Sequence, residues 1–248
     1  MLLYKYRGNV GLDNNDFIRD IDMISNNEIW CSKILSLNDP TEASFSLKQF
    51  EKNLTLGLKA VSLLKIKKDE QENVDAYKNA LENLMKVHYE HSGIYSLSKV
   101  YDNALMWAHY GNSHRGFCIE YNFNNLQELD LKYVEENSPL SHQYKFDKVN
   151  YSDKIFSLSN INPKNDDLIK FLFNKSKVWS YEEEYRIVTY LNGKFTYNEN
   201  CLKSIIFGLN MKHEEKEYII NKLCDKEIRF YQMMRKKDEF KFYKEQIL

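Results

Sequence analysis

The scarcity of glycine and proline is the feature that most restricts the folds open to this chain. Its 248 residues contain 8 Gly and 3 Pro, against 18 Tyr and 14 Phe. Doubly wound nucleotide-binding folds need a glycine-rich turn directly after a strand, where the backbone approaches a phosphate. No predicted strand in this sequence is followed by such a turn. We therefore exclude that fold class.

Strand-like and helix-like patterns are intermixed along the chain. Alternating or continuous apolar runs predict strands at 3–7, 28–32, 94–98, 116–121, 148–151, 185–190, 204–208, 228–233 and 240–243. Apolar residues at spacings of three and four predict helices at 17–24, 44–66, 77–88, 104–110, 167–177 and 213–223. This mixture predicts a single α+β domain over residues 1–248, with a mixed, largely antiparallel sheet, flanking helices and a helical hairpin inserted at 44–90.

The charge and cysteine content narrow the functional classes. The 35 Lys and Arg balance 36 Asp and Glu, which excludes a polycation but leaves room for a local basic groove. No run of about 18 apolar residues is present, so we expect no membrane span. The four cysteines (Cys31, Cys118, Cys201 and Cys224) are scattered, which is typical of reduced thiols in a cytoplasmic protein. We therefore expect a cytoplasmic location and assign no metal ligands.

The densest polar segment is 179–186, with the sequence WSYEEEYR. If a strand begins at Glu184, the side chains of Glu184 and Arg186 face the same side, and Glu182 in the preceding loop can reach that side too. Two such carboxylates can divide the work, because one can stabilise a developing cation while the other orients or deprotonates a nucleophile. The alternative is a solvated acidic turn with an arginine ion pair. Trp179, directly ahead, favours a pocket.

Two earlier strands also carry polar side chains that suit a ligand. Ser96 and Ser98 place two hydroxyls on one face of their predicted strand, where they can hold a ribose, a phosphate or a carboxylate. Arg7 lies on the first predicted strand, next to Tyr6. An arginine on a central strand needs an anionic partner, which is either a bound phosphate or a carboxylate such as Glu120, Glu182 or Glu184.

Aromatic, imidazole and guanidinium groups gather in the segment 107–116, around the end of a short predicted helix. We expect Leu105 and Ala108 to pack inward. His109 or Tyr110 would then face a pocket, with this helix as one of its walls.

Seven motifs together resemble the bacterial domain-of-unknown-function family numbered 2971. They are, in order, 4–7 (YKYR), 30–32 (WCS), 37–42 (LNDPTE), 95–98 (YSLS), 105–110 (LMWAHY), 115–120 (RGFCIE) and 179–186 (WSYEEEYR). The resemblance covers roughly residues 2–208. It implies kinship with that family and brings no established activity.

The chain is also more distantly similar to ADP-ribosyltransferases, many of which use an Arg, a Ser-x-Ser and a Glu-x-Glu on successive strands. Here the same order is Arg7, then Ser96 and Ser98, then Glu182 and Glu184. The resemblance implies NAD as the substrate, with Arg7 on phosphate or ribose, Ser96 organising the pocket and Glu184 stabilising an oxocarbenium-like transition state. It also implies a protein or nucleic-acid acceptor, in a bacterial toxin or phage-defence effector.

From the residues and this resemblance together we assign two groups of site residues. Glu184, Glu182 and His109 are the predicted catalytic residues. The predicted NAD-binding residues are Tyr6, Arg7, Ser96, Ser98, Trp107, Tyr110, Trp179 and Arg186. Arg7, Ser96, His109 and Glu184 are expected to converge on one cleft, although they are far apart in the sequence.

Two other function classes stay open on the sequence. One is a non-catalytic nucleotide- or nucleic-acid-binding module, in which basic residues form an anion site and aromatic rings stack on bases. Its anion site would use Lys5, Arg7, His109, His114 and Arg115. The other is a metal-dependent phosphodiesterase or nuclease, with Glu120, Glu182 and Glu184 around a divalent metal.

Overall fold

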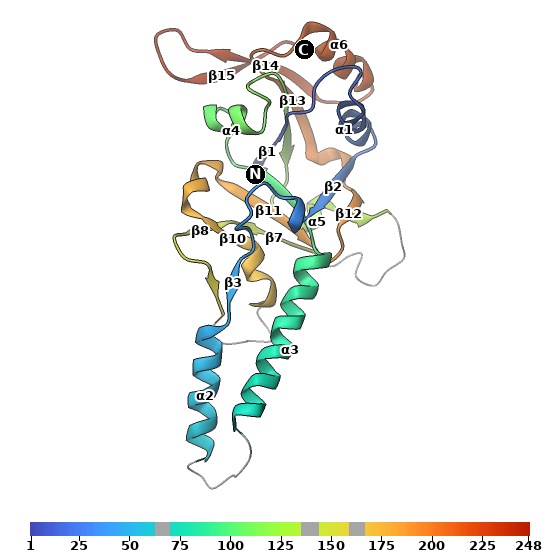
Figure 1. Ribbon diagram of the computed structural model, residues 1–248. Coiled ribbons are helices and arrows are strands. Elements are labelled where there is room, and N and C mark those ends of the chain that lie inside the picture. The colour runs from blue at the N-terminus through green and yellow to red at the C-terminus, as the bar shows by residue number, and fades with distance from the viewer. Residues whose placement is uncertain (63–69, 135–143, 159–166) are drawn as a thin grey trace.

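A large mixed sheet forms the centre of the molecule (Figure 1). The computed structural model describes residues 1–62, 70–134, 144–158 and 167–248. The strand order is β15-β14-β13-β5-β1-β4-β2-β12-β6, and β11 joins this path by pairing with β4 and with β7. Among the described strands of this sheet, β13 and β14 pair in parallel and the other pairs are antiparallel. The predicted α+β class with a mixed, largely antiparallel sheet is therefore confirmed.

The bounds of the elements follow the sequence prediction closely in the first half of the chain. The strands of the large sheet are β1 (Leu2–Arg7), β2 (Glu28–Lys33), β4 (Gly93–Ser98), β5 (Phe117–Asn122), β6 (Lys132–Tyr133), β7 (Tyr144–Lys148), β11 (Glu184–Thr189), β12 (Gly193–Thr196), β13 (Leu202–Phe207), β14 (Arg229–Arg235) and β15 (Phe242–Gln246). Two small parallel pairs join β8 (Asn150–Ser152) to β10 (Asn174–Ser176) and β3 (Phe45–Ser46) to β9 (Phe156–Ser157). The α-helices are α1 (Asn15–Ser25), α2 (Lys48–Ser62), α3 (Glu70–His91), α4 (Ala104–His109), α5 (Leu126–Leu129) and α6 (His213–Lys222). Short 3-10 helices are η1 (Ile34–Ser36), η2 (Asp167–Phe173), η3 (Lys177–Glu182) and η4 (Glu199–Cys201).

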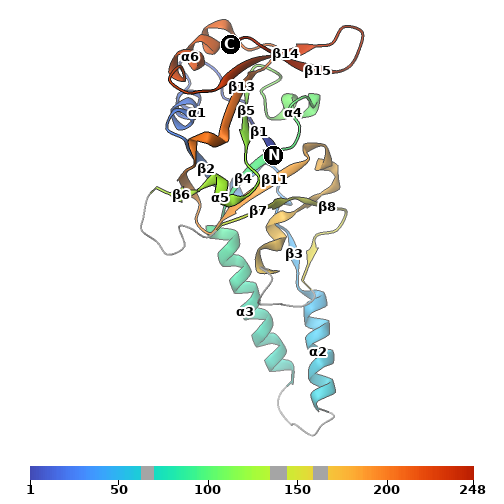
Figure 2. The ribbon, with the colours of Figure 1, turned by 180° about the vertical axis from the view of Figure 1, so that it is seen from behind.

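Helices cover both faces of the sheet beside its central strands. Alternate residues of β1 point to opposite faces, so Leu3 joins the core under α1 and α6 while Tyr6 joins the core under α4. Figure 2 shows α1 and α6 together near one end of the sheet and α4 at a distance from them. Packing on both faces fixes the position of β1, which lies between β4 and β5.

The helices α2 and α3 lie side by side and extend away from the sheet (Figures 1 and 2). Leu81 and Met85 of α3 are buried at the end near the sheet, together with Leu47 just before α2. The predicted apolar stripe is only partly buried, because Tyr77 and Leu84 are exposed to 62% and 51%. The connection at 63–69 lies outside the described residues.

The predicted helix at 167–177 is wrong in its second half. Residues 167–173 form the 3-10 helix η2, and Asn174–Ser176 then form β10, which pairs with β8. This pairing places the ammonium of Lys175 among buried carboxylates. The ion pairs are tertiary contacts, and they prevail over the local helical pattern. No helix in the described parts of the chain is long and apolar enough to cross a membrane.

Candidate functional site

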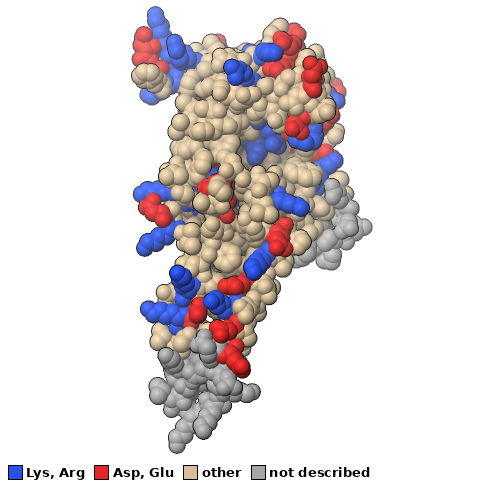
Figure 3. All heavy atoms as spheres, in the orientation of Figure 1, with Lys and Arg blue, Asp and Glu red and all other residues tan. Residues whose placement is uncertain are grey.

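A pocket of about 250 Å³ opens beside β1, β4 and β11, at the centre of the molecule. The strand pairing brings these three segments together, because Ser98 of β4 pairs with Tyr4 of β1 and with Glu184 of β11. Carboxylate groups lie inside the hollow, which Figure 3 shows as red atoms recessed in the middle of this face. The opposite side of the pocket is formed by Tyr110 and by the loop after η1.

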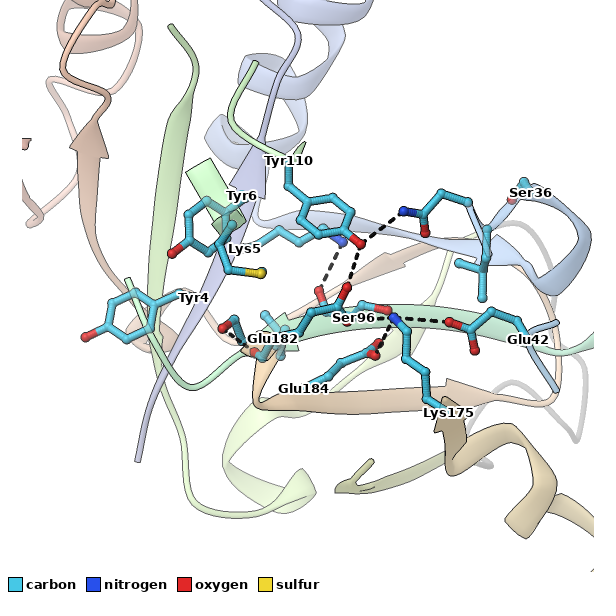
Figure 4. A pocket seen from close by; sticks show the side chains of 15 residues that line it. Tyr4, Lys5, Tyr6, Ser36, Glu42, Ser96, Tyr110, Lys175, Glu182 and Glu184 are labelled. Carbon is cyan, nitrogen blue, oxygen red and sulfur yellow. Dashed lines mark hydrogen bonds and ion pairs between the residues drawn. The ribbon is translucent and has the colours of Figure 1, made fainter. Parts of the chain in front are cut away.

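Lys175 holds three buried carboxylates together at the base of the pocket (Figure 4). Its Nζ lies 2.6 Å from Glu182 Oε2, 3.1 Å from Glu42 Oε1 and 3.2 Å from Glu184 Oε2. Burial alone would lower the pKa of Lys175, but the charges of Glu184, Glu42 and Glu182 raise it above its usual value. Lys175 is therefore a fixed cation in this cluster.

Arg186 completes the cluster from behind the pocket. Its Nε donates to Glu184 Oε1 at 2.8 Å, and its Nη2 donates to both oxygens of Glu42 at 2.9 Å. Its Nη1 donates to the carbonyl of Leu172 at 2.6 Å, and only 1% of the Arg186 side chain is exposed. Because the guanidinium is planar, it fixes the orientation of both carboxylates. We name the residues Glu42, Lys175, Glu182, Glu184 and Arg186 the buried ion cluster.

The pKa values of the two carboxylates in the acidic segment, Glu182 and Glu184, are shifted in opposite directions. Burial would raise the pKa of Glu184, but the charges of Arg186 and Lys175 and hydrogen bonds from Arg186 and Ser96 lower it to about 2. Burial raises the pKa of Glu182, with a further contribution from the charge of Glu184, against the lowering effect of Lys175. Separated pKa values let one carboxylate remain ionised while its neighbour exchanges a proton.

Tyr110 connects Glu182 to the loop that covers the pocket. Its hydroxyl donates to Glu182 Oε1 at 2.6 Å and accepts from Asn38 Nδ2 at 3.0 Å. Both contacts fix the position of the tyrosine ring, which forms part of the pocket lining. Tyr110 therefore positions the carboxylate and narrows the pocket.

We expect Tyr110→Phe to raise the pKa of Glu182 further, because the variant loses the hydroxyl that stabilises the charged form. The loss of a hydrogen bond to a buried carboxylate should also cost about 1–3 kcal/mol of the free energy of unfolding. Carbon-13 NMR titration of the glutamate carboxyls and urea denaturation would measure the two effects. Tyr101→Phe is the matched control because Tyr101 does not line the pocket. Equal titration curves in Tyr110→Phe and wild type would contradict the assignment.

The serines and the lysine on the pocket floor have defined contacts. Ser98 Oγ donates to the carbonyl of Glu182 at 2.6 Å and accepts from the amide of Val100, which fixes the turn that leads into β11. Lys5 Nζ donates to the carbonyl of Ser96 at 3.0 Å and lies 4.7 Å from the centre of the Tyr95 ring. Both serines line the pocket, as the predicted site requires.

Arg7 does not line the pocket, so its expected convergence with Ser96 and Glu184 is wrong. Its side chain is partly exposed, and its Nε lies 3.9 Å from Asp20 Oδ1 on α1, which supplies the anionic partner. None of the three glutamates proposed as its partner takes that role in the described structure. Lys5, two residues earlier on the same face of β1, is the basic residue of this strand that lines the pocket.

The predicted helix wall at 104–110 is present, but its inward residues differ from those expected. Leu105 and Ala108 are exposed, whereas Met106 and Trp107 are buried. Met106 and Tyr110 line the pocket. A helix as short as α4 buries one narrow face, and the contacts of Trp107 with β1 determine which face it is.

Besides Arg7 and Arg186, which was predicted to bind NAD, three predicted site residues lie near the pocket without lining it. Trp107 is completely buried, and its indole N–H donates to the carbonyl of Tyr101. His109 is exposed, with its ring 6.5 Å from that of Trp179. Trp179 is half-buried, and its ring centre lies 5.2 Å from Lys175 Nζ. The geometry therefore supports neither a catalytic role for His109 nor ligand contacts of Trp107.

The residues proposed for a metal site or a basic anion site are dispersed. Glu120 forms an ion pair with Lys244 of β15 and does not line the pocket. His114 stacks on Trp107 at 6.0 Å, and burial lowers its pKa. Among the described residues, no group of three His, Cys, Asp or Glu side chains is placed to hold a metal ion. The ammonium of Lys175 lies where the three carboxylates of the pocket meet.

Sequence reasoning did not assign Glu42 or Lys175 to the site, and it placed Lys5 only in the anion site of the alternative binding module. A buried arginine on a central strand needs a carboxylate partner, so an acidic residue is expected near it. This argument does not identify Glu42 as that residue. Lys175 lay within an expected helix, where a lysine is normally solvated. The alternative of a solvated acidic turn is wrong for Glu182 and Glu184, which are both buried.

The comparison with protein families gives one match. Residues 106–187 match the family described as "Protein of unknown function (DUF2971)". The expected resemblance to this family is confirmed over these residues. The DUF2971 segment contains Tyr110 and four of the five residues of the buried ion cluster, whereas Lys5, Glu42 and Ser96 precede it. No curated protein and no solved structure matches the chain. The similarity to ADP-ribosyltransferases stays a prediction.

Proposed function

We propose that the protein binds NAD in this pocket and cleaves the bond between nicotinamide and ribose, as an ADP-ribosyltransferase or an NAD glycohydrolase does. The observation that carries this proposal is the contrast between the two pocket carboxylates. Glu184 has a pKa of about 2 and is held by Arg186 and Lys175, while Glu182 has a raised pKa and a hydrogen bond from Tyr110. This pair matches the two tasks of the reaction.

Cleavage of the glycosidic bond leaves its electron pair on the pyridinium nitrogen, so nicotinamide departs neutral and positive charge develops on the ribose. A fixed carboxylate stabilises that charge best when it is already oriented and ionised. Glu184 meets both conditions, because its oxygens accept hydrogen bonds from Arg186 at 2.8 Å and 3.0 Å. Glu182 would accept the proton of the incoming water or acceptor group.

The arrangement of the strands also supports the proposal. β1, β4 and β11 lie next to one another, so Lys5, Ser96 and Glu184 line the same pocket. This is the order of basic residue, serine and glutamate in the ADP-ribosyltransferases that the sequence resembles, with Lys5 in place of Arg7. Tyr6 and Tyr110 add aromatic lining beside these polar groups.

We place this activity in the cytoplasm, because the four cysteines are free, three of them are buried, and NAD is a cytoplasmic metabolite. A toxin or phage-defence effector would act there by depleting NAD or by modifying a protein or nucleic-acid acceptor.

The direct test is incubation of the purified protein with NAD, with chromatography of nicotinamide and ADP-ribose. We expect stoichiometric release of the two products at the same rate with and without EDTA, since no step of the proposal needs a divalent metal. Calorimetric titration with NAD in the same buffer measures binding separately. Binding without release would contradict the proposal and favour the non-catalytic nucleotide-binding module. Release that requires Mg²⁺ or Mn²⁺ would favour metal-dependent chemistry.

A further inference from the structure

The buried ion cluster carries an excess of negative charge. It contains three carboxylates, from Glu42, Glu182 and Glu184, but only two cations, from Lys175 and Arg186. Both cations already contact two or more of these carboxylates. When Glu182 is ionised, one negative charge is therefore uncompensated at the wall of the pocket, where charge interactions are stronger than in water.

Lys5, the remaining basic residue in the lining, is only partly protonated near neutral pH and balances this charge incompletely. Burial, with a contribution from the neighbouring Arg7, lowers the pKa of Lys5 to about 7. Its amine already donates to the carbonyl of Ser96. Among the described residues, no arginine or histidine lines this pocket. Arginine, which binds a phosphate through two parallel hydrogen bonds, is thus missing from its lining.

Aromatic rings line the pocket beside the carboxylates, and the hydroxyl of Tyr110 contacts Glu182 directly. Figure 4 shows the rings of Tyr6 and Tyr110 on one side and Glu182 and Glu184 on the other. Electron-rich ring faces attract organic cations, and the attraction is greatest where water is excluded. The volume of about 250 Å³ is below the roughly 300–1,000 Å³ of pockets that enclose a drug-sized ligand. Such a pocket can take one end of a dinucleotide.

We propose that the pocket selects its ligand by a positive charge on an aromatic ring, and that it takes the pyridinium-nucleoside end of a nucleotide while the phosphates stay outside. The choice of a pyridinium rests on the proposed function, whereas the preference for a cation rests on the charges and rings alone. On this basis nicotinamide riboside, which has no phosphate, contains every group that the pocket recognises.

Binding of two nearly identical probes tests the charge preference without any turnover. N1-methylnicotinamide is a cation, and its 1,4-dihydro form has the same substituents and no charge. At pH 8 we expect calorimetry to show about tenfold tighter binding of the cation. Nicotinamide riboside and its 5′-phosphate should bind within about threefold of each other. Equal binding of the two methylated probes, or much tighter binding of the phosphate, would overturn the proposal.

Lys5→Met gives the matched variant, because a methionine fills the same space without an amine. The groups around Lys5 are Arg7 on β1, Asp20 on α1, Cys31 on β2, Tyr95 on β4, Cys118 on β5 and Glu184 on β11. Protonation of Lys5 opposes cation binding, so wild-type affinity should rise from pH 6 to pH 8. In Lys5→Met this rise should be smaller and the affinity at pH 6 greater. Weaker binding of the cation by Lys5→Met would overturn the proposal.

The outcomes separate this proposal from the proposed function. If the cation is preferred but NAD stays intact, the charge preference stands and the glycosidic-bond cleavage fails. If NAD is cleaved but the uncharged probe binds as tightly as the cation, cleavage stands and the charge preference fails.

Discussion

Lys175→Met is expected to lower the free energy of unfolding by about 3–5 kcal/mol at pH 8, because removal of one partner leaves buried charges uncompensated. In this variant Glu42, Glu182 and Glu184 keep their positions, and Arg186 is the remaining cation of the buried ion cluster. Methionine fills the volume of the lysine stem, so the decrease in stability reflects the missing charge more than a change in packing.

The stability lost in Lys175→Met is expected to depend on pH in a definite direction. Without Lys175, Glu182 loses the main charge that opposes the effect of burial, so its pKa in the folded state rises further above that of the unfolded chain. The folded variant then binds more protons than the unfolded chain, so its stability falls as the pH rises through that range. In the wild type, Lys175 has a raised pKa and remains charged from pH 5 to pH 8. The deficit of the variant should therefore be smaller at pH 5 than at pH 8.

Urea denaturation at both pH values measures the deficit. Lys177→Met is the matched control, because Lys177 is two residues away, largely exposed, and 4.0 Å from Asp153. Exposed ion pairs contribute about 0–1 kcal/mol, so this control should change little. If the two variants were equally stable at pH 8, the cluster would not contribute charge stabilisation to the fold.

Glu184→Gln is expected to reduce nicotinamide release by on the order of 100-fold or more, because the amide keeps the shape of the side chain and removes its charge. The substitution acts on the group that we assign to stabilising the ribose cation. Glu182→Gln should reduce transfer to an acceptor more than hydrolysis by water, since Glu182 faces the incoming nucleophile in the proposed reaction.

Loss of stability must be separated from loss of chemistry in these variants. Glu184 accepts hydrogen bonds from Arg186 and Lys175, so Glu184→Gln will also lower the melting temperature. Glu120→Gln is the matched control, because Glu120 is a buried carboxylate with a lysine partner outside the pocket. It should be destabilised but keep its turnover. A destabilised Glu184→Gln protein with full turnover would refute the proposed role of Glu184.

Local sequence patterns predicted the strands of the site better than the contacts between them. The strands that carry Ser96 and Glu184 were predicted within one or two residues, because periodicity along one segment determines them. Glu42 and Arg186 are separated by 144 positions, and nothing near either residue identifies the other. The resemblance to ADP-ribosyltransferases favoured Arg7 over Lys5 as the basic residue of the site. Both side chains lie on the same face of β1, and the position of α1 determines which of them pairs with Asp20.

The buried ion cluster also restricts how this chain can change during evolution. Its five residues come from three separate segments, at 42, 175 and 182–186, and each side chain contacts at least one oppositely charged neighbour. Neutral replacement of either base, Lys175 or Arg186, leaves three buried carboxylates with a single cation, so one-step paths through these two positions pass through an unstable intermediate. Paired replacements of an acid and a base avoid that intermediate. Among diverged relatives these positions should therefore vary together or hardly at all.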